Sequence, residues 1–284
     1  MTTNIKPRYL IFDIESIADG ELVRRVKFPD AVSPSEAIQL YKNELSAVNR
    51  TDFVPYTFQL PISIVVAKID SDMSLIDIKS LDEPQFRPHV MTKNFWVGWE
   101  RYGKPTLVTF NGRKFDVPLL ELSAFRFGIS LPKWFRGEKG ANRNRYNLHA
   151  HLDLQELLTN FGATYMVGGL NLVANYLGKP GKMGVQGHMV QEMYEQGKLK
   201  EISDYCRCDV LDTYFVFLRS MVLMGEINLE REQQLVEETH AWLESHAEEC
   251  VAYQDYLQKW GVWADPWKNG DSESHEGEPH ESVT

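Results

Sequence analysis

The sequence predicts an α/β fold, a mixed sheet flanked by helices, and three observations indicate it. Three β-rich segments come first, at residues 8–16, 60–69 and 74–80, and only a short turn at 70–72 separates the last two. A helical stretch then precedes a short buried strand at 106–110, which leads into another helix. Three early strands followed by a helix, a strand and a helix are typical of a mixed sheet whose first strands pair antiparallel.

The first strand, residues 8–16, ends in two carboxylates one residue apart, Asp13 and Glu15. Its dense apolar run indicates burial on both faces, and the alternation of side chains along a strand places Asp13 and Glu15 on the same side. Repulsion and desolvation make such a pair costly unless it meets water, holds a proton or binds cations. This stretch alone leaves open a solvated strand end and a pair that shares divalent ions.

The other elements follow from caps, apolar spacing and turn residues. Ser33-Pro34-Ser35-Glu36 is a capping box and starts a helix that ends near Asn49. A helix is expected from about 84 to 102, where Gly103-Lys104-Pro105 ends it, and the next runs from about 115 to 127. Further helices are expected at 154–161, 170–177, 186–196 and 199–224. Residues 226–260 are predicted as one helix, whose apolar stripe packs on the body or on a second copy.

Charge is distributed unevenly along the chain. The net charge is −10, but residues 229–284 hold 14 acidic and 3 basic side chains, which leaves 26 acids and 27 bases in residues 1–228. Overall acidity therefore does not exclude a polyanionic partner, because local basic surface is what binds phosphates. We expect one domain at 1–228, an acidic C-terminal helix at 229–268 and a disordered acidic tail at 269–284.

The sequence gives no indication of secretion or membrane insertion. The stretch from Met1 to Lys6 leads straight into the first strand, and no apolar run approaches membrane-spanning length. The three cysteines, Cys206, Cys208 and Cys250, lack zinc-binding spacing, and the first two fall on different faces of a helix. We therefore expect a reducing, cytoplasmic location.

Two later stretches place acids at the start and on one face of helices. After the strand at 106–110, an Asn111-Gly112 turn leads to Asp116 at the start of a helix, where an acid is also simply favourable for the helix dipole. In the helix at 199–224, Tyr205 and Asp209 are four residues apart and share one face. Taken alone, an acid in the position of Asp209 is more often an ordinary surface residue.

Together the three acidic stretches resemble, in order and context, the motifs of the 3′-5′ exonuclease superfamily that includes the proofreading domains of DNA polymerases. The chain resembles in particular the predicted exonucleases related to the exonuclease domain of family B DNA polymerases, over about residues 8–225. The second motif departs from the superfamily pattern by one extra residue between Asn111 and Asp116. The strings that carry the resemblance are Phe12-Asp13-Ile14-Glu15, Thr109-Phe110-Asn111-Gly112, His151-Leu152-Asp153-Leu154, Tyr205-Cys206 and Asp209-Val210.

The superfamily has a tyrosine branch and a histidine branch, and the chain resembles the first. Tyr205 lies four residues before Asp209, as in the tyrosine branch. The histidine branch has its histidine five residues before the aspartate, whereas His149 and Asp153 are only four apart. We therefore reject the histidine branch and expect Asp153 to have a support role or to cap the helix that starts at Leu154.

The resemblance implies a ribonuclease-H-like fold and phosphodiester hydrolysis with two divalent ions, Mg²⁺ or Mn²⁺. It implies that Asp13 holds both ions, that Glu15 and Asp209 hold the ion that activates water, and that Asp116 supports the other. Tyr205 would orient or deprotonate the attacking water. Orientation is favoured, because a phenol ordinarily titrates near pH 10.

Substrate contacts are predicted on the segment 132–146, which contains five bases and three aromatic residues. This composition suits phosphate contact and base stacking on a single strand, although a solvated loop can have the same composition. Lys179 and Lys182 are further phosphate candidates or plain surface lysines. The residues predicted to bind substrate are Phe110, Asn111, Phe115, Arg136, Arg143 and Arg145.

The activity we expect is a metal-dependent 3′-5′ exonuclease that releases nucleoside monophosphates from the 3′ end of single-stranded or frayed DNA. An RNA 3′-5′ exonuclease and a non-catalytic module that binds single-stranded nucleic acid are the alternatives. A role in proofreading or DNA repair would require a partner that the sequence does not name, and the sequence leaves the oligomeric state open.

Overall fold

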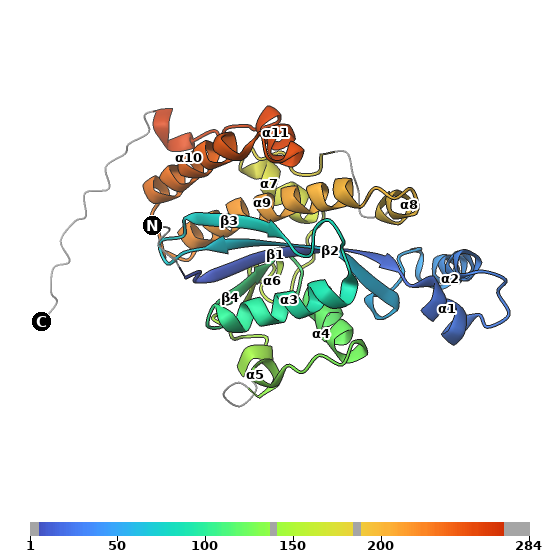
Figure 1. Cartoon of the computed structure of the whole chain (residues 1–284). Helices are drawn as coiled ribbons and strands as arrows, with labels where there is room; N and C mark the ends of the chain where they lie inside the picture. The colour runs from blue at the N-terminus through green and yellow to red at the C-terminus, as the bar shows by residue number, and fades with distance from the viewer. Residues whose placement is uncertain (1–5, 137–140, 184–188, 270–284) are drawn as a thin grey trace, which may run out of the picture.

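The computed structural model describes residues 6–136, 141–183 and 189–269, arranged around one five-stranded sheet (Figure 1). The strand order is β3-β2-β1-β4-β5. β2 pairs antiparallel with both β1 and β3, whereas β4 runs parallel to β1 and β5 runs parallel to β4. The predicted mixed sheet with an antiparallel start is confirmed. Its strands are β1 (Tyr9–Ala18), β2 (Gln59–Ile69), β3 (Leu75–Ser80), β4 (Thr106–Thr109) and β5 (His151–Asp153).

Helices cover both faces of the sheet (Figure 1). On one face lie α6 (Leu154–Leu158), α7 (Gly169–Tyr176) and the long α9 (Leu199–Leu223), which share the main apolar core with the strands. The opposite face carries α3 (Pro88–Arg101), α4 (Asp116–Arg126) and α5 (Pro132–Phe135) over a second, tryptophan-rich core. Beyond the end of β1, α1 (Gly20–Lys27) and α2 (Pro34–Asn49) form a small core of their own.

The alternation along β1 determines which face receives its two carboxylates. Leu10, Phe12 and Ile14 belong to the core under α3 and α4, whereas Ile11 belongs to the core under α9. Asp13 and Glu15 follow the parity of Ile11, so β1 directs both toward the α9 side. The sequence-based prediction that the two acids share a side is therefore confirmed.

The short pairing between β1 and β4 leaves room beside these acids. β4 pairs with β1 only from Tyr9 to Ile11. Past Ile11, the edge of β1 is instead bordered by the turn that follows β4 and by the first residue of α4, Asp116, which lies close enough to hydrogen-bond the backbone of Ile14. A parallel neighbour that stops early thus opens a place for a third carboxylate.

Local capping behaves as the sequence predicts at α2. Ser33 Oγ accepts a hydrogen bond from the backbone N–H of Glu36 at 3.1 Å, and the Glu36 carboxylate accepts from the N–H of Val32 at 2.6 Å. The first bond satisfies an N–H group that the helix itself leaves unpaired, and the second ties the residue before the N-cap to the first turn of the helix.

The prediction of one helix over 226–260 is wrong. Two helices occupy this range, α10 (Leu229–His246) and α11 (Val251–Gln258), and between them Cys250 adopts an extended conformation. An unbroken 35-residue helix would be about 50 Å long and would extend past the sheet. The break instead lets α10 and α11 both pack on the core under α9, through Leu235, Leu243, Tyr253 and Tyr256. The apolar stripe is therefore covered by the body of the same chain.

Other boundaries differ by smaller amounts. α3 starts at Pro88, after a turn in which the backbone N–H of Arg87 donates to Asp82 at 2.9 Å, and α6 ends at Leu158. α1 and α5 were not expected, and the three-residue β5 was expected only through the strand-to-helix cap assigned to Asp153. α8 (Val190–Glu195) falls inside the helix expected at 186–196. Residues 186–188 of that helix, residues 137–140 of the basic segment, and the tail from 270 onward lie outside the described residues.

The described residues also include the short 3₁₀ turns η1 (Tyr56–Phe58) and η4 (Pro266–Asn269). Among the described residues, none of the helices combines the length and the apolar character that crossing a membrane requires.

Candidate active site

Asp13 and Glu15 at the centre of the sheet meet Cys206 of α9. Donor atoms of the three side chains all lie within 4.8 Å of one another. The Cys206 thiol lies 3.3 Å from the backbone oxygen of Asp13 and 3.6 Å from its carboxylate. Sequence reasoning gave Cys206 no role, although a position three residues before Asp209 on a helix places it on the neighbouring face.

Asp116 joins this group from the opposite side of β1. It is the first residue of α4 and is only 5% exposed. The Asp13 and Asp116 carboxylates both lie near the backbone N–H of Ile14, and burial, followed by the charge of Asp13, raises the pKa of Asp116. The two interpretations of Asp116 are compatible, because an acid in the first turn of α4 is also an acid beside β1.

Tyr205 and Asp209 complete the group from α9. They lie one turn apart, and the Tyr205 hydroxyl lies near enough to the Asp209 carboxylate for each group to influence the pKa of the other. Burial raises the pKa of Glu15, and the negative charges of Asp13 and Asp209 raise it further. The structure therefore brings together all five residues for which the resemblance implies a catalytic role.

Desolvation dominates the electrostatics of the four carboxylates. Burial raises the pKa of Asp13 from 3.8 to about 6 and raises the pKa values of Glu15, Asp116 and Asp209 well above their ordinary range. Their mutual repulsion adds to the effect, while the positive charge of Lys182 opposes it at Glu15 and Asp209. Within the described part of the chain, no lysine, arginine or histidine forms an ion pair with any of the four. The group therefore favours protons or external cations.

The Tyr205 hydroxyl is suited to donate a hydrogen bond rather than to accept a proton. Burial raises its pKa above the ordinary value of a phenol, and the charges of Asp209 and Glu15 raise it further. The neutral phenol can hold a water molecule or a carboxylate oxygen, and this agrees with the orienting role that the sequence favours.

A groove of about 330 Å³ opens beside Glu15. Two residues predicted to bind substrate, Asn111 and Phe115, line it. Phe53, which sequence reasoning missed, also lines the groove, and its ring centroid lies 5.8 Å from that of Phe115. Phe53 is 56% exposed and follows α2 in a loop without any motif, so no sequence signal singled it out. The groove offers an aromatic wall next to the carboxylates.

The other predicted substrate residues have mixed surroundings. Phe110 is partly buried against the main core. The guanidinium of Arg143 pairs with Glu121 at 3.0 Å, and that of Arg145 pairs with Glu156 at 2.7 Å, whereas Arg136 is exposed. The charges of two of the three arginines are thus already matched within the protein, and their contact with phosphate stays a prediction.

The two lysines of the 178–182 turn have different surroundings. Lys182 is exposed, and its charge reaches Glu15 and Asp209. Lys179 is only 4% exposed, lies 3.6 Å above the ring centroid of Trp260 and donates to the backbone oxygen of Gly261 at 3.2 Å. Neither expectation for Lys179, a phosphate contact or a plain surface lysine, is right, because the segment after α11 covers this side chain.

Comparison with known proteins decides the family. A family model described as predicted 3′-5′ exonuclease related to the exonuclease domain of PolB matches residues 51–260, well over half of the chain. The chain belongs to this family. No relative among curated proteins matches it. Membership of this exonuclease family confirms the resemblance inferred from the motifs, and the five-stranded mixed sheet with helices on both faces is the ribonuclease-H-like fold expected with it.

The matched span covers only part of the candidate site. It contains Asn111, Asp116, Tyr205 and Asp209 but begins after Asp13 and Glu15 on β1. It also contains the whole of α10 and α11, which the resemblance drawn from the motifs, ending near residue 225, left out. The assignment of Asp13 and Glu15 to the site therefore rests on their geometry next to α4 and α9.

Proposed function

We propose that this protein is a metal-dependent 3′-5′ exonuclease that releases nucleoside monophosphates from the 3′ end of single-stranded or frayed DNA. One observation carries the proposal: four desolvated carboxylates from β1, α4 and α9 converge beside a tyrosine hydroxyl without an ion-pairing partner among the described residues. Membership of a family of predicted 3′-5′ exonucleases supports it.

The donor set fits hard divalent cations. All four carboxylates offer oxygen ligands, and each has a raised pKa that a bound cation would relieve. In the proposal Asp13 would hold both ions, Glu15 and Asp209 would hold one of them, and Asp116 would support the other. Two Mg²⁺ or Mn²⁺ ions supply charge neutralisation at the scissile phosphate and the leaving oxygen.

The chain's own groups position the other reactants. The neutral Tyr205 hydroxyl, which lies beside Asp209, orients the attacking water. The groove beside Glu15 takes the terminal nucleotide, with Asn111 as a polar contact and the Phe53–Phe115 wall for stacking on its base.

Strand selection and cellular setting belong to the same proposal. A groove bordered by aromatic side chains suits an unpaired base, and Arg136, Arg143 and Arg145 would follow the backbone of the single strand upstream. A reducing, cytoplasmic setting is supported by the three cysteines, all of which are free thiols.

An exonuclease assay tests the proposal directly. Purified protein with Mg²⁺ or Mn²⁺ should shorten a 5′-labelled single-stranded DNA from its 3′ end, chelation should stop the reaction, and Asp13→Ala and Asp209→Ala should each abolish it. Glu201→Gln, an exposed acid on the same helix as Asp209, is the matched control and should retain full activity. Equal activity in the alanine variants would indicate a contaminant and end the claim.

Substrate choice is read from the same assay with matched strands. Faster shortening of an RNA strand of the same sequence would replace DNA with RNA as the substrate. Oligonucleotide binding without cation binding and without hydrolysis would replace the enzyme with a binding module.

Replacing Tyr205 by phenylalanine separates orientation from binding. Loss of one hydrogen bond to the reacting group costs about 1–3 kcal/mol, so kcat should fall about 10- to 100-fold while KM changes little. Steady-state kinetics on a single-stranded oligonucleotide measure both constants. A raised KM with an unchanged kcat would instead place Tyr205 in substrate binding.

A further inference from the structure

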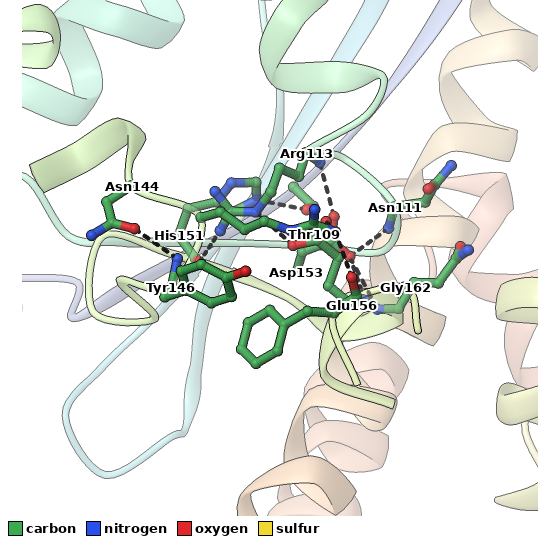
Figure 2. Close-up of polar contacts among 12 residues, drawn as sticks. Thr109, Asn111, Arg113, Asn144, Tyr146, His151, Asp153, Glu156 and Gly162 are labelled. Carbon is green, nitrogen blue, oxygen red and sulfur yellow. Dashed lines mark hydrogen bonds and ion pairs between the residues drawn. The ribbon is translucent and has the colours of Figure 1, made fainter. Parts of the chain in front are cut away.

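A buried carboxylate outside the proposed metal site connects two neighbouring strand ends. Asp153, the last residue of β5, is 1% exposed. One of its oxygens accepts a hydrogen bond from the backbone N–H of Asn111 at 3.0 Å, and the other accepts from the N–H of Arg113 at 2.9 Å (Figure 2). Asp153 therefore holds the turn that follows β4, the neighbouring strand.

The same carboxylate also starts a helix. Its first oxygen accepts from the N–H groups of Gln155 and Glu156, at 3.0 and 3.2 Å, so Asp153 is the N-cap of α6. The sequence-based expectation that Asp153 caps this helix is confirmed. A cap needs only one oxygen, however, and the second oxygen of Asp153 is given entirely to the turn.

Side chains of the turn reinforce this connection. Arg113 Nε lies 2.9 Å from the Glu156 carboxylate, and Arg113 Nη2 donates to the backbone oxygen of His151 at 2.7 Å (Figure 2). Glu156 also pairs with Arg145 at 2.7 Å. Between β4 and β5 themselves, Thr109 Oγ1 and His151 Nε2 lie 2.8 Å apart. Burial lowers the pKa of His151 to about 3, so its ring carries no charge.

Backbone hydrogen bonds connect this turn directly to the start of α4. The backbone N–H of Lys114 donates to the oxygen of Asn111 at 3.2 Å, and that of Val117 donates to the oxygen of Gly112 at 2.9 Å. Val117 is the second residue of α4, and Asp116 is the first. Asn111 has a φ of 66°, a left-handed conformation that is uncommon for residues with a side chain but that asparagine adopts more readily than most. A shift of this turn would therefore move Asn111 and Asp116 together.

We propose that Asp153 is a positioning residue, which holds the turn from Asn111 to Arg113 and so sets the place of Asp116 in the metal site and of Asn111 in the groove. This role rests on the proposed function, because the position of the turn matters for catalysis only if Asp116 belongs to the metal site. Among the described residues that line the groove, Asp153 is absent. Its carboxylate makes hydrogen bonds only to the backbone N–H groups of Asn111, Arg113, Gln155 and Glu156 among the described residues. Its charge contributes to the raised pKa of Asp116, and its hydrogen bonds act through the backbone that carries Asn111 and Asp116.

Two substitutions separate holding the turn from capping α6. Asp153→Ser keeps a short hydroxyl that can cap α6 but removes the oxygens that reach the turn. Asp153→Asn keeps one acceptor oxygen and presents an amide N–H₂ where the N–H of Arg113 needs an acceptor. Ser33→Ala, which removes the cap of α2 far from the turn, is the matched control for a loss of stability alone.

The first measurement is backbone hydrogen exchange followed by NMR. In the metal-free protein the amides of Asn111 and Arg113 should exchange at least tenfold faster in Asp153→Ser than in the wild type, and Arg113 should do so in Asp153→Asn. Ser33→Ala should leave both amides protected. Unchanged exchange in the Asp153 variants would overturn the proposal, and this arm does not depend on any enzymatic activity.

The second measurement is titration with Mn²⁺ by calorimetry, together with steady-state kinetics. Both Asp153 variants should bind Mn²⁺ at least tenfold more weakly than the wild type and should recover part of their lost kcat at high Mn²⁺, while Ser33→Ala should match the wild type. Faster exchange with wild-type Mn²⁺ affinity would overturn the link from the turn to Asp116. A wild-type protein that neither binds Mn²⁺ nor degrades a single strand would instead overturn the proposed function, while the exchange arm still decides whether Asp153 holds the turn.

Discussion

Asp13→Asn is expected to abolish nuclease activity and, without divalent ions, to raise the unfolding temperature. Asp13 is the carboxylate common to both proposed ions, so no other residue can replace it. In the metal-free protein the charge of Asp13 destabilises the folded state, because desolvation raises its pKa from 3.8 to about 6. With a discount for its partial exposure, removing that charge should add about 1–2 kcal/mol to the free energy of unfolding, or roughly 2–6 °C.

The effect has a defined dependence on pH. A carboxyl group whose pKa is higher in the folded than in the unfolded state binds more protons when folded, so its ionisation costs stability as pH rises. For Asp13 this loss accumulates between about pH 4 and pH 6 and is complete above the folded pKa of about 6. The stability difference between Asp13→Asn and the wild type should therefore grow across this window and then stay constant. Thermal unfolding in a chelator from pH 4 to pH 8 measures it.

Added cations should reverse the order of stability. Saturating Mn²⁺ stabilises only the protein that binds it, so the wild type should gain more than Asp13→Asn. Asp72→Asn, which removes an exposed acid in the turn between β2 and β3, should change neither activity nor stability. A lower metal-free unfolding temperature in Asp13→Asn would show that the Asp13 carboxylate stabilises the fold and is not a strained ligand.

The parts of the site that could be predicted from the sequence have local signals. Asp13 and Glu15 interrupt a dense apolar run, and strand alternation alone places them on one side. Tyr205 and Asp209 have helical spacing, and the helix that carries them is long enough to show its period. These signals need no knowledge of which element lies beside which.

The parts that were missed depend on packing between elements. Cys206 meets Asp13 only because α9 crosses β1, and Phe53 meets Phe115 only because the loop after α2 returns to the start of α4. The break between α10 and α11 has the same origin. Helical spacing continues across Cys250, but the core that both helices cover does not extend in a straight line, and tertiary packing prevails over local periodicity.

Removing residues 229–284 is expected to prevent stable folding of the remaining chain. Leu235, Leu243 and Tyr256 are fully buried, and Tyr253 is nearly so, all in the main core under α9. Burial of such a side chain is worth about 1.5–3 kcal/mol, so these four contribute about 6–12 kcal/mol. A domain has only about 5–15 kcal/mol of net stability, and the loss approaches the whole of it. Circular dichroism of the 1–228 fragment during thermal unfolding measures the outcome.

Single substitutions on α10 test how much its buried face contributes to stability. Leu243→Ala opens a cavity in the main core and should cost about 2–5 kcal/mol, whereas Glu237→Ala on the exposed face of the same helix should cost almost nothing. Removal of 270–284, the tail predicted to be disordered, is the control for shortening the chain and should leave the unfolding temperature unchanged.

The same helices also satisfy buried polar groups of the main body. Tyr256 donates a hydrogen bond to Asp212 of α9 at 2.7 Å, and the segment after α11 places Trp260 and Gly261 over Lys179. Without α10 and α11, Asp212 loses that hydrogen bond and Lys179 loses its ring and carbonyl partners, in addition to the lost apolar burial. If the 1–228 fragment nonetheless unfolds cooperatively at the wild-type temperature, α10 and α11 are an appendage and the core under α9 is complete without them.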